Sequence, residues 1–145
     1  MINCVAVVGK SNAPLFLKTY HVPETLKFHY TVHTSLDVVE EKCTIRAPSS
    51  TVSTPQDMYL GLLYPTEEFR IYGYITATKT KFIVVTDDVD VRSPLMEQFC
   101  KNLHTLYVNM VCNPFYAIEQ EQKIESPVFI RQVEQLVQRF NEGSR

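Results

Sequence analysis

Two histidines, His29 and His33, stand four residues apart in the segment HYTVH. This spacing puts both rings on one side of a helix, where a histidine pair can bind zinc. The HExxH motif also requires a glutamate directly after the first histidine, and Tyr30 occupies that position. A cysteine–histidine nucleophile pair is disfavoured too, because the ten residues from His33 to Cys43 span about 15 Å of helix. We therefore interpret both histidines as ordinary helix residues and expect no metal site.

Three aspartates, Asp87, Asp88 and Asp90, lie in the segment DDVD and suggest a cation site. The calcium loop of an EF-hand also needs a glycine and a glutamate at later fixed positions, and both are missing here. A helix-start signal, Ser93 followed by Pro94, comes three residues later. Because acidic residues stabilise the positive end of a helix, we interpret the cluster as a structural turn between a strand and a helix.

The segment Asn113–Pro114–Phe115–Tyr116 matches NPxY, a peptide motif that phosphotyrosine-binding-type domains recognise. Such peptides act from flexible tails and bind by adding a strand to a sheet edge. Here the motif closes a long apolar helix pattern, and the proline steers the preceding asparagine away from helical conformation. We expect aromatic packing at a helix end, and we keep Phe115 and Tyr116 as candidate protein-interaction residues.

Asp37 is the third candidate for protein interaction. It lies in the middle of a predicted helix, and we expect it to border the apolar stripe of that helix. An acid in such a place is either a solvated side chain or a partner contact that fixes register with an opposing cation. No Ser–His–Asp order, carboxylate pair or lysine-bearing phosphate loop stands out elsewhere. We therefore expect a binding protein that is not an enzyme, with no catalytic residues and no cofactor.

The composition agrees with a binding protein. The chain has 145 residues, a formal net charge of −2 and 45% hydrophobic residues, which suits a single domain over 1–145. A near-neutral charge attracts neither nucleic acid nor an anionic membrane. The four glycines leave little material for Gly-rich phosphate loops. The apolar runs are too short to cross a bilayer, no signal peptide is apparent, and the four cysteines are widely spaced, so we expect a cytosolic protein.

Short apolar and alternating runs predict five strands. They are expected at 2–8, 15–20, 58–64, 69–76 and 81–86. The first two flank a cluster of turn residues and form a hairpin, and the last three are joined by short turns and form an antiparallel meander. In the strand 69–76 both alternating sets of side chains are apolar or aromatic, so we expect both faces of the sheet to be covered.

Three helices complete the pattern, at 24–45, from Ser93 to a point before Asn113, and from Ser126–Pro127 to Gly143. Their expected apolar stripes are Phe28, Val32, Leu36, Val39 and Cys43; Leu95, Phe99, Leu103, Leu106 and Met110, widened by Cys100, Tyr107 and Val111; and Phe129, Val133, Leu136, Val137 and Phe140. The order β-β-α-β-β-β-α-α predicts an α+β fold. Its five-stranded antiparallel sheet would carry the first helix on one face and the last two on the other.

Three segments of the chain resemble the sedlin-type small subunits of the TRAPP complex. They are LKFHYTVHTSLDVVEEK (26–42), YLGLLYPTEEFRIYGYITATKTKFIVV (59–85) and CNPFY (112–116). The resemblance covers about residues 1–116 and implies a longin-like (SNARE-like) fold, in agreement with the predicted element order. It weakens after residue 117 and departs at 47–55, a Ser/Pro-rich loop.

The resemblance also implies a function. The chain would be a non-catalytic adaptor subunit of a vesicle-tethering complex that exchanges guanine nucleotides on Rab GTPases. Its partners would be a neighbouring small TRAPP subunit and a large one, with a Rab GTPase engaged through the complex. The expected location is cytoplasmic, peripheral at Golgi and endoplasmic reticulum membranes, in ER–Golgi and Golgi vesicle transport, without membrane insertion. Asp37 matches the acid of the family's first helix, which favours a partner contact over a solvated side chain.

Other modules with a similar fold are alternatives. A small subunit of an adaptor complex would share the longin-like fold, but it does not account for the segment CNPFY. We do not expect a SNARE, because no heptads and membrane anchor follow the predicted domain before Arg145. A profilin-like binder usually needs paired terminal aromatics including tryptophan, and the chain has no tryptophan.

Overall fold

The computed structural model describes residues 2–9, 11, 14–20, 25–46, 59–76, 79–87, 93–112 and 127–143. Its strands are β1 (Ile2–Val8), β2 (Pro14–Thr19), β3 (Tyr59–Pro65), β4 (Phe69–Ile75) and β5 (Lys81–Asp87). Its helices are α1 (Thr25–Arg46), α3 (Ser93–Val111) and α4 (Pro127–Gly143). The predicted order β-β-α-β-β-β-α-α is confirmed, with several ends shifted by one residue.

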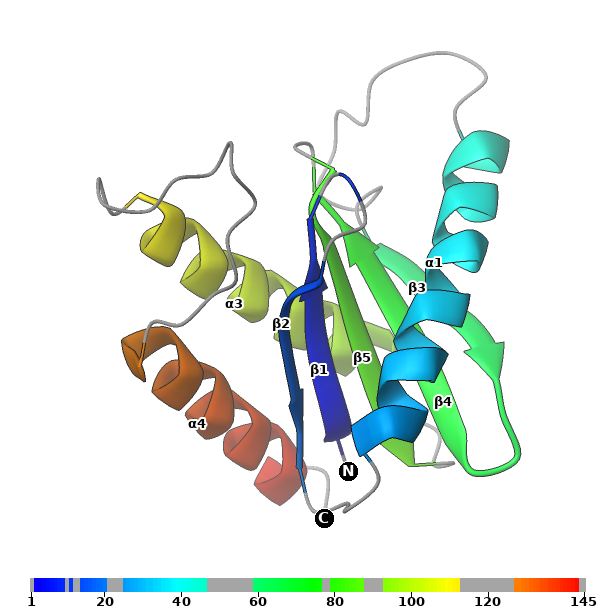
Figure 1. Cartoon of the computed structure of the whole chain (residues 1–145). Coiled ribbons are helices and arrows are strands. Elements are labelled where there is room, and N and C mark those ends of the chain that lie inside the picture. The colour runs from blue at the N-terminus through cyan, green and yellow to red at the C-terminus, as the bar shows by residue number, and fades with distance from the viewer. Residues whose placement is uncertain are drawn as a thin grey trace.

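The five strands form one antiparallel sheet in the order β2-β1-β5-β4-β3 (Figure 1). Strand β5 lies at its centre between β1 and β4, and every residue of β1 is buried. Strand β1 is almost continuously apolar in sequence, as expected for a strand that is covered on both faces of the sheet. Pairing of β1 with β5 joins the N-terminal hairpin to the meander, so two local units of the chain become a single sheet.

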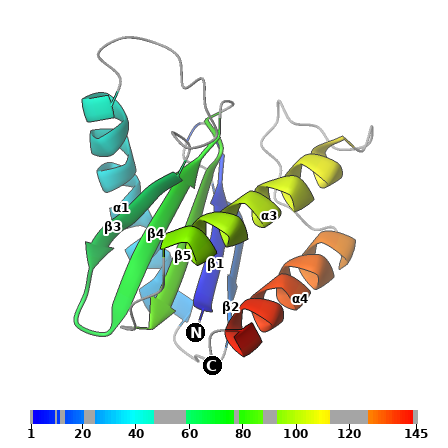
Figure 2. The same ribbon diagram turned by 180° about the vertical axis from the view of Figure 1, so that it is seen from behind.

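Helix α1 covers one face of the sheet, and α3 and α4 cover the other (Figures 1 and 2). Strand β4 shows how the pleat divides the side chains. Ile71 and Ile75 pack on the α1 side, whereas Tyr72 and Tyr74 pack on the α3–α4 side. The prediction of a five-stranded α+β sheet with both faces covered is therefore confirmed.

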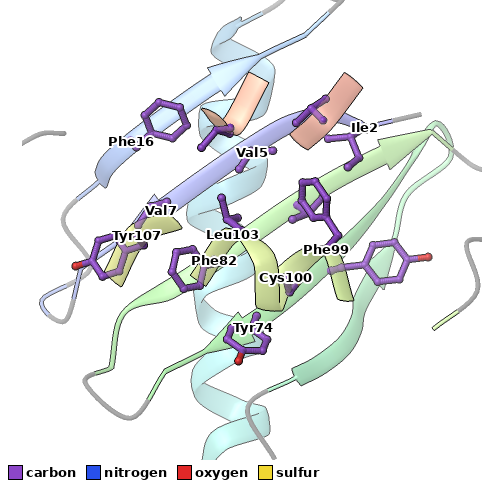
Figure 3. Packing of buried hydrophobic residues seen from close by; sticks show 14 of the residues in the cluster. Ile2, Val5, Val7, Phe16, Tyr74, Phe82, Phe99, Cys100, Leu103 and Tyr107 are labelled. Carbon is purple, nitrogen blue, oxygen red and sulfur yellow. The ribbon is translucent and has the colours of Figure 1, made fainter. Parts of the chain in front are cut away.

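The core on the α3–α4 side is rich in aromatic rings (Figure 3). Phe82 is fully buried, and its ring meets that of Tyr107 edge-on at 5.6 Å between centroids. Two more edge-on pairs tie α4 to β2 and to α3: Phe16–Phe129 at 5.4 Å and Phe99–Phe140 at 5.3 Å. The predicted stripe of α4 is confirmed, since Phe129, Val133 and Val137 are buried and Leu136 and Phe140 pack at the edge of the cluster.

The buried stripe of α3 differs from the prediction at its first residue. Leu95 is half exposed (50%), and the fully buried side chain at this end is Met96. The stripe follows positions 96, 99, 100, 103 and 107, a helical spacing that turns Leu95 toward solvent. The prediction was wrong there because both residues are apolar, and only packing against the sheet selects between them. Leu106 and Met110 pack at the edge of the same cluster.

The core on the α1 side is mainly aliphatic and is covered by one helix. The predicted stripe Phe28, Val32, Leu36 and Val39 is buried, and the side chain of Cys43 lies outside the described residues. On this side the Leu63 side chain of β3 lies close over Gly73 of the neighbouring strand β4, since a Cβ added at Gly73 would lie 2.9 Å from Leu63 Cδ1. Gly61, at a bulge of β3, has φ +75°, a conformation that side chains rarely adopt.

Candidate protein-interaction surface

The buried cysteines are unsuited to nucleophilic chemistry. Burial raises the pKa of Cys4 to about 12 and that of Cys100 to about 12, with the Glu97 charge adding to the effect at Cys100. Because the thiolate is the reactive form, both side chains are inert thiols at neutral pH. They act as small apolar residues of the two cores.

The histidine pair of α1 and the aspartates at and after the end of β5 were the candidates for a metal site. His29 is half-buried and His33 is exposed on α1. Across the described residues, no three His, Cys, Asp or Glu side chains gather closely enough to hold a metal ion. The carboxylate of Asp87 accepts a hydrogen bond from the Asn3 amide, which ties the end of β5 to β1. Asp88 and Asp90 lie outside the described residues.

Asp37 is exposed and lies on the side of α1 that faces away from the sheet. The buried residues around it in sequence are Ser35, Leu36 and Val39. At 100° per residue, the centre of the buried stripe lies roughly 140° around the helix from Asp37. The expectation that Asp37 borders the apolar stripe is therefore wrong. Its carboxylate is instead presented outward, in a position where a partner can reach it.

Two large apolar residues share this outward side with Asp37. Leu26 is 84% exposed and Tyr30 is 74% exposed, and His33 is exposed between Tyr30 and Asp37. Positions 26, 30, 33 and 37 follow the spacing i, i+4, i+7, i+11, which forms one line along a helix. We call these four residues the outer stripe of α1. It is apolar toward the N-terminus of the helix and acidic toward the C-terminus, where Glu40 and Glu41 are also exposed.

The sequence prediction missed Leu26 and Tyr30. The signal was present, because α1 carries apolar residues at helical spacing on two opposite sides. Scattered exposed apolar residues are normal, but two of them one turn apart beside an acid have the composition of a binding surface. Tyrosine in particular is enriched among the residues that dominate binding energy at protein interfaces.

The outer stripe stands on a helix that is anchored toward both ends. Near the N-terminus, the Lys27 ammonium pairs with Glu68 and lies 5.1 Å from the ring centroid of Phe69. Toward the C-terminus, Lys42 Nζ donates to the Leu62 carbonyl at 2.7 Å. These contacts join α1 to β3 and to the turn between β3 and β4. A binding surface on such a helix loses little conformational entropy when a partner binds.

Phe115 and Tyr116 lie outside the described residues. Their role in protein interaction, predicted from the NPxY match, stays a prediction.

The sheet with one helix on one face and two on the other is that of a longin-like domain. The sequence matches the Sedlin family over residues 7–139, and the chain belongs to that family. Trafficking protein particle complex subunit 2-like protein of Dictyostelium discoideum is 47% identical over 141 residues, which cover 94% of this chain and 96% of the relative. The proteins of the same name from Xenopus tropicalis and Bos taurus are 47% and 45% identical over 118 residues, which cover 80% of this chain and 84% of each relative.

No helix in the described part of the chain is both long and apolar enough to cross a membrane.

Proposed function

We propose that this chain is a non-catalytic adaptor subunit of a TRAPP-type complex, the trafficking protein particle complex named in its relatives. It would link a neighbouring small subunit to a large one, in ER–Golgi and Golgi vesicle transport. A Rab GTPase would be engaged only through the assembled complex. The protein would be cytoplasmic and peripheral at Golgi and endoplasmic reticulum membranes, with no cofactor, no nucleic-acid ligand and no direct membrane insertion. The Sedlin-family match and the named relatives support this proposal.

The observation that carries the adaptor role is the outer stripe of α1. It combines two exposed apolar side chains, Leu26 and Tyr30, with the outward carboxylate of Asp37. Burying the apolar pair in a partner pocket would supply affinity, and pairing Asp37 with a partner cation would fix the register of the contact. An adaptor needs such a surface on the outside of a fold whose core is complete without it.

The direct test is copurification of the full chain with candidate small and large subunits, followed by affinity measurement. We expect a shared elution peak at micromolar concentration. Asp37→Asn, which keeps the size and removes the charge, should weaken binding of one subunit about tenfold. Asp37→Tyr should weaken it further while the chain stays folded. Absence of any shared peak would contradict the proposal.

A matched control is Glu142→Gln, which removes an exposed acid from α4 on the opposite side of the sheet. Its affinity for the same subunit should equal that of the parent chain.

The alternative function, a small subunit of an adaptor complex, has the longin-like fold in its favour, whereas the Sedlin-family match favours the TRAPP-type assignment.

A further inference from the structure

Strands β2 and β3 form the two edges of the sheet (Figure 1). The two edges are protected against pairing in different ways. Strand β3 has two register shifts, at Tyr59/Gly61 and at Leu62/Tyr64, whereas the ladder of β2 on β1 has one, between Val7 and Val8 at the start of β2. The ammonium of Lys42 lies over this edge and donates to the carbonyls of Leu60 and Leu62, at 3.4 Å and 2.7 Å. Bulges and a covering lysine are the devices by which proteins block pairing of an edge strand with another chain.

The register of β2 on β1 shows which backbone groups point outward. The Tyr20 amide donates to the Asn3 carbonyl at 2.7 Å, which makes this a hydrogen-bonded antiparallel pair. In the same register Val5 is opposite Lys18. Because bonded and non-bonded pairs alternate, Lys18 and Tyr20 bond inward to β1. Leu17 precedes Lys18, and Thr19 lies between Lys18 and Tyr20. These two residues direct their N–H and C=O groups away from the sheet.

Nothing in the described part of the chain pairs with this outer side of β2. Its single charged side chain does not cover the edge, because the Lys18 ammonium is drawn toward α4. It lies 3.4 Å from Glu134 and 5.6 Å from the ring centroid of Tyr20. In the described part of the chain, the covering charge that protects β3 therefore has no counterpart on β2. The outward N–H and C=O groups of β2 alternate, and an extended backbone is the ligand that matches them.

We propose that the outer edge of β2 binds an extended segment of a partner subunit, which adds a sixth strand to the sheet through Leu17 and Thr19. This rests on the proposed function, since it presumes that the chain is part of a complex. The side chains of Leu17 and Thr19 are half-buried, and Leu17 packs against the α1-side core. The added segment would carry uncharged or β-branched side chains on that side and no proline at its bonded positions.

A second copy of this chain fits the same edge poorly. A two-fold pairing that uses both Leu17 and Thr19 of each copy places Lys18 directly opposite Lys18 of the other, and like charges in that position are destabilising. A pairing centred on Leu17 needs Leu15 in regular register, but the ladder is shifted there, between Val7 and Val8. A segment of different sequence meets neither obstacle.

The test is amide hydrogen exchange on the full chain, alone and in the reconstituted complex with its copurifying subunits. We expect the Leu17 and Thr19 amides to exchange about 100-fold more slowly in the complex. Leu17→Pro removes one outward donor and should weaken binding about 10- to 100-fold. Leu17→Val keeps the donor and is the matched control, with binding close to that of the parent chain.

Each other outcome has a definite meaning. If the subunits copurify while both amides exchange at unchanged rates, strand addition at β2 is overturned and the proposed function stands. If no subunit copurifies, both are overturned. If native mass measurement shows a dimer of this chain that Leu17→Pro dissociates, the edge belongs to a second copy and the partner-strand proposal is overturned. The exchange measurement on the parent chain decides the matter even where Leu17→Pro does not fold.

Discussion

The two sides of the sheet are packed differently. On the α3–α4 side, two helices enclose a cluster with many buried aromatic side chains: Phe16, Tyr20, Tyr72, Tyr74, Phe82, Phe99, Tyr107 and Phe129. On the α1 side, one helix lies over a mainly aliphatic cluster in which Phe28 is the buried aromatic among the described residues. The α3–α4 side therefore holds most of the buried aromatic side chains of the described core, and the α1 side carries the outer stripe that we propose as a binding surface.

This difference in packing has a geometric reason. Two helices share the coverage of one face, so their inward stripes meet each other as well as the sheet, and Phe99 of α3 contacts Phe140 of α4. All three helices keep an outward side in solvent, but the exposed apolar residues of α1 are 74% and 84% exposed, against 42% to 60% for Leu95, Val108 and Val128 of α3 and α4. The large apolar residues of α1, Leu26 and Tyr30, find no place in the fold and remain available to a partner.

Phe82→Ala tests the α3–α4 side and should have the largest effect on the free energy of unfolding. The ring is fully buried, and it meets Tyr107, Tyr74 and His104 at 5.6 to 6.0 Å between centroids. We expect a loss of about 4–5 kcal/mol in the free energy of unfolding, measured by chemical denaturation. Phe28→Ala, its counterpart on the α1 side, has one ring contact, with Phe69 at 5.2 Å, and should lose about 3 kcal/mol. A larger loss for Phe28→Ala would reverse the comparison.

Gly73→Ala tests how tightly the α1 side is packed. The new Cβ would lie 2.9 Å from Leu63 Cδ1, and Leu63 is itself buried and must shift. We expect a loss of about 1–2 kcal/mol by the same denaturation assay. In a Leu63→Ala background the clash is removed, so adding Gly73→Ala there should cost less. Equal losses in both backgrounds would show that the close contact does not limit packing.

His104 gives the α3–α4 side a pH dependence. The ring packs between Tyr74 and Phe82, and burial lowers its pKa from the ordinary value of 6.5. Since the unfolded chain binds this proton more readily, the contribution of His104 to stability is present above about pH 6.5. It is lost as the pH falls through the lowered pKa. Thermal unfolding between pH 7.5 and 5 should show a decline that His104→Gln reduces, and an unchanged slope in that variant would contradict the assignment.

Tyr30→Ser tests the outer stripe of α1 and should have the smallest effect on stability. The side chain is 74% exposed, so the free energy of unfolding should change by no more than about 0.5 kcal/mol. Affinity for the subunit that contacts α1 should fall about tenfold or more in a binding assay. Val128→Ser is the matched control, since Val128 is a 60% exposed apolar residue on α4. Similar losses of affinity in both variants would remove the distinction between the two sides.

The sequence predicted the elements well because each rests on local signals. Alternation and short turns located the strands, and Ser–Pro pairs together with apolar spacing located α3 and α4. It placed Leu95 in the core wrongly, because periodicity cannot choose between adjacent apolar residues such as Leu95 and Met96. For α1 the sequence predicted the buried stripe correctly, but it wrongly predicted that Asp37 borders this stripe. It did not identify Leu26 and Tyr30 as exposed surface residues. A helix with apolar residues on two sides does not reveal from its pattern which side faces a sheet.

The sequence by itself determined the order of the elements, their types and the buried faces of most of them, since these follow from spacing along the chain. The resemblance to sedlin-type subunits was carried by continuous segments, and the Sedlin-family match agrees with it. Tertiary structure decided what depends on long-range pairing. Pairing of β1 with β5 puts β2 and β3 at the two edges and leaves Leu17 and Thr19 facing outward. Packing of α1 on the sheet turns Tyr30 and Asp37 to solvent, because a helix buries the stripe that best fits the face beneath it.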